Sequence, residues 1–123
     1  MPSLKDKGIA LLGSLSAVDM KTAATTTIFT TPVGKVTRIA FVVIRDTTAS
    51  LAGGTAYTFG TGFRGNASVD LSSLTTAATD YIVLDQNNTK STEIAASTAF
   101  AITVSTGATA AGTATVDVFG YTT

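Results

Sequence analysis

The sequence predicts an all-β domain, an antiparallel β-sandwich or jelly roll of about seven to eight strands. Short runs in which apolar and polar residues alternate recur along the chain, and the segments between them are rich in Gly, Thr and Ser. Alternation with period two is typical of strands, and these separators are typical of turns. Beyond residue 24 the sequence shows no sustained helical periodicity. The one helical turn that we expect there is Asp70–Leu74, capped by Asp70.

The first two predicted strands flank a turn at Pro32–Lys35. Thr25–Thr31 is rich in Thr and holds two large apolar side chains. Val36–Arg45 is the strongest strand in the sequence. Both of its faces are apolar, which is typical of a strand in the middle of a sheet that is covered on both sides. Its two faces carry Ile39, Phe41 and Val43 on one side, and Val36, Ala40, Val42 and Ile44 on the other.

Five shorter runs complete the predicted sandwich. In the run that begins at Phe100, large apolar residues alternate with small or hydroxyl residues, and Gly107–Gly112 leads into the last strand. We predict that these last two strands form an antiparallel hairpin. On the last strand Phe119 and Tyr121 share a face with a charged residue, so we expect part of this face to contact a partner. The five runs are Tyr57–Phe59, Tyr81–Leu84, Thr92–Ala95, Phe100–Ser105 and Thr113–Tyr121.

The N-terminal segment departs from this pattern. Its apolar residues Ile9, Leu11, Leu12, Leu15 and Val18 fit either a short amphipathic helix or an extended arm, and the sequence does not decide between the two. We therefore divide the chain into an N-terminal arm, residues 1–24, and a sandwich domain, residues 25–123. No segment approaches the roughly 20 apolar residues of a membrane-spanning helix, so we expect no membrane partner.

The composition argues against catalysis and metal binding, and it favours association with a partner. The 123 residues include no His, Cys or Trp, so the chain lacks the usual proton shuttle, the commonest metal ligand and any thiol. We expect no enzymatic activity, no cofactor and no metal. Eight basic and eight acidic residues cancel and are spread along the chain, which argues against nucleic-acid binding. Only 13% of residues are charged, and a surface of Thr, Ser, Ala and Gly loses little when it is buried against a partner.

Two local motifs have simple interpretations. Gly60–Gly65 matches the dinucleotide-binding pattern G-x-G-x-x-G, but the following residues begin no helix to receive a pyrophosphate. We interpret it as a loop that exposes Phe63 and Arg64 for interaction. Asp85–Thr89 gathers oxygen ligands, but one carboxylate is too few for a calcium site, and we expect a turn there.

The order of several segments resembles that of small tailed-bacteriophage virion structural proteins, most closely the capsid decoration or cement proteins. The resemblance runs from Lys21–Lys35 through Ala49–Thr55, Tyr57–Gly62 and Gly107–Ala114 to Asp117–Tyr121. It implies a protein made in the host bacterial cytoplasm that sits on the capsid surface of the virion. It also implies that the chain binds the major capsid protein, uses its N-terminal arm to do so, and forms a homotrimer. The candidate interaction residues are Ile9, Leu11, Leu12, Leu15, Phe63, Arg64, Phe119 and Tyr121.

Two alternatives remain open on the sequence alone. A head-fibre, neck or tail component would share this fold and composition. A carbohydrate-binding module would need exposed aromatic residues on a sheet face. The chain has six Phe and three Tyr but no Trp, so it is poorly supplied for sugar stacking, although Tyr57, Tyr81 and Tyr121 keep this alternative open.

Overall fold

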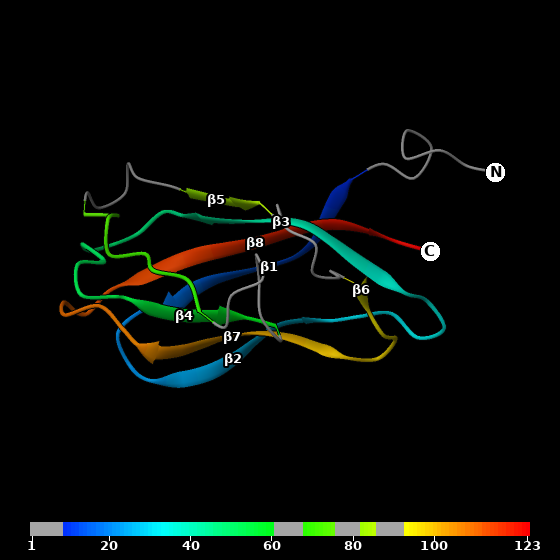
Figure 1. Ribbon diagram of the computed structural model, residues 1–123, viewed down its shortest axis with the longest axis horizontal. Coiled ribbons are helices and arrows are strands. Elements are labelled where there is room, and N and C mark those ends of the chain that lie inside the picture. Colours follow the sequence, from blue (N-terminus) through cyan, green and yellow to red (C-terminus); the bar gives the residue numbers. More distant parts are fainter. Residues whose placement is uncertain (1–8, 61–67, 76–81, 86–92) are drawn as a thin grey trace.

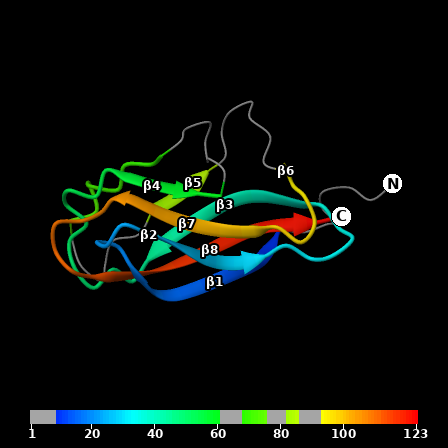
Figure 2. The same ribbon diagram turned by 90° about the horizontal axis from the view of Figure 1, so that it is seen from below.

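Two antiparallel β-sheets pack face to face in a computed structural model of the chain (Figures 1 and 2). The structure describes residues 9–60, 68–75, 82–85 and 93–123. Sheet A has the strand order β1-β8-β3-β5, and β6 also pairs with β3; sheet B has the order β2-β7-β4. The predicted all-β sandwich is therefore confirmed. The strands are β1 (Ala10–Asp19), β2 (Ala24–Thr30), β3 (Thr37–Arg45), β4 (Ala56–Phe59), β5 (Ile82–Asp85), β6 (Glu93–Ile94), β7 (Ala99–Thr106) and β8 (Thr113–Thr122).

The strand pairs are nested in the manner of a jelly roll. β1 pairs with β8, β2 with β7 and β3 with β6, so partners come from opposite ends of the chain. In this scheme β4 and β5 would form the innermost pair. Instead, β5 pairs with β3 in sheet A, and β4 lies in sheet B. β5 and β6 both run antiparallel to β3, opposite Phe41–Ile44 and Thr37–Arg38 respectively, so they form two pieces of one interrupted strand.

The predicted strands from residue 25 onward agree with the structure to within about a residue at most ends, but the predicted final hairpin is wrong. β7 lies in sheet B and β8 in sheet A, so the connection between them crosses from one sheet to the other. It is held at the β1–β2 connection, where the Ala108 amide donates to the Met20 carbonyl at 2.9 Å. Alternation identifies a strand and its inner face, but it does not identify the strand's partner.

The predicted division into an arm (1–24) and a sandwich (25–123) also needs correction. Ala10–Asp19 is a full strand of sheet A, and Ala24 is already the first residue of β2. Two bulges in β1 explain the misleading pattern, because each inserts an extra residue and shifts the side that faces inward. The side chains that pack on the core, Leu12, Leu15 and Val18, are therefore spaced by three, as they would be on a helix.

β3 lies inside sheet A as predicted, between β8 and the interrupted strand, but it is not covered on both faces. A register shift at Ala40 separates Ile39, which is buried, from Phe41 and Val43, which lie half-buried on the outer side. The bulge thus places Ile39 and Phe41 on opposite faces, against the simple alternation.

The core lies between the sheets and includes the hydroxyl group of Tyr57. Tyr57 is fully buried, and its hydroxyl donates to the Met20 carbonyl at 2.8 Å. Burial raises the pKa of this tyrosine.

The predicted helical turn at Asp70 is a hydrogen-bonded turn. The Leu74 amide donates to the Leu71 carbonyl, and the Asp70 carboxylate accepts from the Ser72 amide at 2.8 Å.

Thr37 is a buried side chain that costs stability. It is fully buried, and its Oγ1 has no hydrogen-bond partner in the described part of the chain. An unpaired buried hydroxyl costs about 1–3 kcal/mol, so we expect Thr37→Val to raise the free energy of unfolding by about 1 kcal/mol. Denaturant unfolding at neutral pH measures this difference.

Thr31 provides the matched control. It is also buried, but its Oγ1 donates to the Ala95 carbonyl at 2.7 Å and accepts from the Thr98 amide at 2.8 Å. Thr31→Val should therefore lower the free energy of unfolding by about 1–2 kcal/mol. A loss of stability in Thr37→Val similar to that in Thr31→Val would contradict the assignment of an unpaired hydroxyl at Thr37.

Candidate interaction surface

The outer face of sheet A carries an apolar row across three neighbouring strands. The register places Leu11 of β1 opposite Phe119 of β8, and Phe119 opposite Phe41 of β3. Directly opposed residues of antiparallel strands point to the same side of the sheet. Leu11 is 54% exposed, and the two phenylalanines are half-buried. We call Leu11, Phe119 and Phe41 the apolar row.

The two rings of the apolar row stack on each other. The ring centroids of Phe41 and Phe119 are 4.8 Å apart, with 20° between the ring planes. This separation matches the roughly 4.8 Å spacing between neighbouring strands, so the rings stand upright on the sheet. Rings that lay side by side in one plane could not approach so closely. Each ring therefore covers one face of the other and presents mainly its edge to a partner.

A polar cluster borders the apolar row on one side. Asp117 of β8, only 7% exposed, accepts hydrogen bonds from Ser14 Oγ at 2.5 Å and from Arg45 Nε at 2.7 Å. Arg45 also pairs with Asp46 at 2.5 Å. Burial of Asp117 acts to raise the pKa of its carboxyl, but the hydrogen bonds from Arg45 and Ser14 outweigh burial, and the pKa lies below its ordinary value. Asp117 is therefore ionised at neutral pH, and the charge of Arg45 compensates it.

The other border of the row is formed by Tyr121 and an ion pair. Tyr121 of β8 is half-buried and lies opposite Arg38 of β3. Arg38 Nη2 donates to Glu93 Oε2 of β6 at 2.5 Å. The outer face of sheet A therefore has an apolar centre with self-compensated charges on either side. This arrangement is typical of a surface that binds another protein, in which an apolar centre is surrounded by a polar rim.

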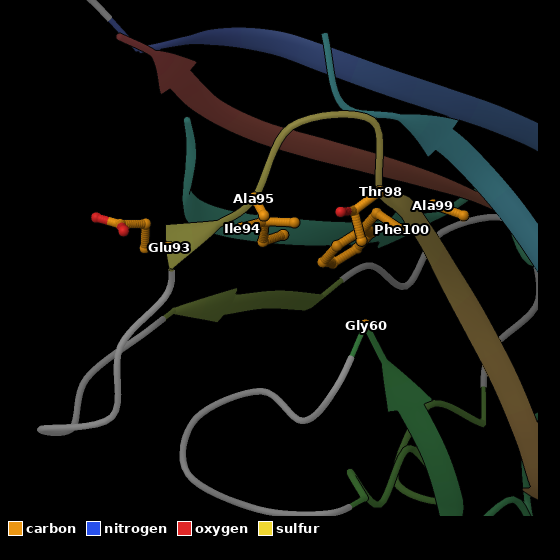
Figure 3. Close-up of a pocket in the computed structure, with 7 residues that line it drawn as sticks. All are labelled: Gly60, Glu93, Ile94, Ala95, Thr98, Ala99 and Phe100. Carbon is orange, nitrogen blue, oxygen red and sulfur yellow. The ribbon is translucent and has the colours of Figure 1, made fainter. Parts of the chain in front are cut away.

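A pocket of about 190 Å³ lies where β6 and β7 approach the end of β4 (Figure 3). Ile94 and Phe100 point into this space, whereas the carboxylate of Glu93 points away from them. The described residues that line the pocket therefore supply no convergent polar groups of the kind by which catalytic and cofactor sites orient a ligand. Its lining residues are Gly60, Glu93, Ile94, Ala95, Thr98, Ala99 and Phe100.

Comparison of the chain with protein-family models, with curated proteins and with solved structures finds no significant match. Within the described ranges, no group of three or more acidic residues is placed to hold a metal ion. The same ranges hold no helix long and apolar enough to cross a membrane. The interpretation of this surface therefore depends on its own geometry.

The structure gathers some of the predicted interaction residues and separates others. Leu11 and Phe119 lie in the apolar row, and Tyr121 borders it. Ile9, 58% exposed, directly precedes β1. Leu12 and Leu15 are half-buried and pack against the core, so they are not freely exposed. Phe63 and Arg64 lie outside the described residues, as do residues 86–89 of the predicted turn.

Sequence reasoning missed Phe41 and Val43 as surface residues. Both were assigned to a strand that neighbours would cover on each side, but they lie half-buried on the outer face of sheet A. The available signal was Arg45, because a charged residue two positions after Val43 marks the face that reaches solvent.

Proposed function

We propose that this chain is a non-enzymatic structural protein of a tailed-phage virion, which binds the capsid surface as a decoration protein. The observation that carries the proposal is the apolar row, Leu11, Phe119 and Phe41, on the outer face of sheet A. A row that spans three strands offers a broad and shallow contact, as a protein that covers a shell requires. The major capsid protein is the proposed partner, as the resemblance described above implies.

The low charge of the chain supports the same role. Only 13% of its residues are charged, and the charges beside the apolar row, Arg45 with Asp117 and Arg38 with Glu93, are already paired within the chain. Covering paired charges costs less than covering isolated ones, because each charge keeps its partner when water is removed. Jelly rolls are frequent in viral capsid proteins, although the fold alone does not assign a function.

The geometry of the rings argues against the carbohydrate-binding alternative. A sugar ring stacks on the open face of an aromatic side chain, but Phe41 and Phe119 each cover a face of the other. Tyr57 is fully buried and unavailable to a ligand. The upright pair is better suited to insertion between the side chains of a protein partner.

The first test is the copy number of this protein in purified virions of its source phage, measured by quantitative mass spectrometry against the major capsid protein. A copy number comparable with that of the capsid protein would support decoration. A copy number far below it would favour the head-fibre, neck or tail alternative. Absence from the virion would contradict the proposal.

A second test changes the apolar row directly. Leu11→Asp places a charge at the exposed end of the apolar row, and we expect at least a tenfold loss of binding to undecorated capsids in a sedimentation assay. Leu11 is 54% exposed, so the fold should tolerate the change. Val33→Asp is the matched control, because Val33 is 84% exposed and lies outside sheet A. Equal binding by both variants would exclude the apolar row as the capsid contact.

A further inference from the structure

β1 and β2 are the outermost strands of their sheets on the same side of the sandwich (Figure 2). They are in close contact at one point, where a Cβ atom at Gly13 would overlap Phe29. Ala24 and Thr26 of β2 lie opposite the buried residues Val104 and Ile102, so they point toward the space between the sheets. Both are nevertheless exposed. Inward-facing residues that remain exposed indicate an opening on this side of the sandwich, within the residues that the structure describes. Leu12 and Leu15 of β1, half-buried, lie on the sheet A side of the same opening.

We call Leu12, Leu15, Ala24 and Thr26 the open seam. Proteins commonly protect such strand edges with charged residues or proline. Here the only charged residues from Ala10 to Thr30 are Asp19 and Lys21, at the connection between the two strands, and the same stretch contains no proline. The bulges of β1 interrupt its edge, but Ala24–Thr27 of β2 pairs with β7 without interruption. The β2 edge is therefore the better template for a further strand.

We propose that a second copy of this chain covers the open seam by antiparallel pairing of β2 with its counterpart, around a two-fold axis at Thr26. This register places Thr26 opposite Thr26 of the second copy, Thr25 opposite Thr27 and Ala24 opposite Ile28. The three central pairs are then Thr with Thr, and such cross-strand pairs stabilise a sheet. Because the paired stretch is uncharged, its own copy meets it without repulsion.

The size of the seam also fits a second copy. β2 has seven residues, which at about 3.3 Å each give a length of roughly 23 Å. Two sheets about 10 Å apart, with their side chains, give a width of roughly 20 Å. The product is about 460 Å² for each copy, or about 920 Å² for the two, which is the size of a weak, concentration-dependent interface. A two-fold contact gives a dimer, in place of the homotrimer that the resemblance implies, and it does not depend on the proposed capsid binding.

The test uses the purified full chain in two measurements. Light scattering after size exclusion should give a mass of about twice 12.4 kDa for the unchanged chain and 12.4 kDa for Thr26→Lys, which sets two like charges opposite each other. Ser105→Lys is the control and should keep the doubled mass, because Ser105 is exposed on β7, the middle strand of sheet B. Far-ultraviolet circular dichroism shows whether each variant keeps its strands.

The second measurement uses the absence of cysteine from the chain. Thr26→Cys should form a covalent dimer under mild oxidation, and Ser105→Cys should remain monomeric on a non-reducing gel. A mass of 12.4 kDa for the unchanged chain at high concentration would overturn the proposal. So would a trimer, or a dimer that Thr26→Lys leaves intact. None of these outcomes bears on the capsid-binding tests of Leu11→Asp.

Discussion

Gly120→Ala is expected to destabilise the fold by about 3 kcal/mol, because sheet A has no room for a side chain at this position. Gly120 lies on β8 between Ala10 of β1 and Ile39 of β3. A Cβ atom built there would overlap the carbonyl oxygen of Arg38 and lie 2.9 Å from Leu12 Cδ1. The Arg38 oxygen belongs to the backbone of a central strand, so it moves only if the sheet deforms. Thermal unfolding of the purified chain measures the effect.

Gly34 separates the effect of space from that of backbone conformation. A Cβ atom at Gly34 meets nothing within 4 Å, but the φ angle there is +72°, which favours glycine. Gly34→Ala should cost only about 1 kcal/mol. Gly34→Asn should cost less, since Asn tolerates this region better, whereas Gly120→Asn should be at least as harmful as Gly120→Ala. Equal losses for Gly120→Ala and Gly34→Ala would contradict the crowding argument.

Asp117→Asn is expected to lower the free energy of unfolding by about 1–2 kcal/mol at pH 7. The change removes the charge that binds Ser14 and Arg45 on the outer face of sheet A. The loss stays below that of a fully buried ion pair because the Arg45 side chain is 45% exposed, so water compensates it in part.

The pH dependence of this loss follows from the lowered pKa of Asp117. A carboxyl whose pKa is lower in the folded than in the unfolded chain stabilises the fold at pH values above its ordinary pKa of about 3.9. That contribution disappears as the pH falls through the lower pKa of the folded state. The stability difference between the unchanged chain and Asp117→Asn should therefore be constant from pH 7 to about pH 5 and shrink below about pH 4.

Asp46→Asn is the matched control for this measurement. Asp46 also pairs with Arg45, but its side chain is 60% exposed, so solvent screens the pair and little change is expected. A difference between the unchanged chain and Asp117→Asn that persisted undiminished at pH 2 would show that the carboxylate charge is not its source.

The sequence predicted the strands well because their inner faces are strongly apolar. Phe100, Ile102 and Val104 alternate with small or hydroxyl residues, and all three are buried as expected. Pairing was harder to predict, since the partner of a strand is chosen by the packing of the whole domain. The bulges in β1 and at Ala40 of β3 changed which residues face outward, and no local feature of the sequence marked them.

The same reasons explain the partial success at the candidate surface. Phe119 and Tyr121 were identified from the simple alternation of the last strand, which has no bulge between them. Phe41 was missed because its position depends on the bulge at Ala40, and its stacking on Phe119 depends on the adjacency of β3 and β8. A surface assembled from three strands that are distant in the sequence becomes visible only once the strand order is known.

The nesting of the strands also has a consequence for biosynthesis. β1, made first, has its sheet partner in β8, made last, and β3 also lies beside β8. At a translation rate of about 5–20 residues per second, β1 waits roughly 5–20 s for that partner to be synthesised. Sheet A therefore cannot be completed until β8 has left the ribosome, whereas the strands of sheet B are all made before β8. A chain that stopped before Thr113 would leave β1 and β3 without the strand that lies between them, so sheet A would stay incomplete.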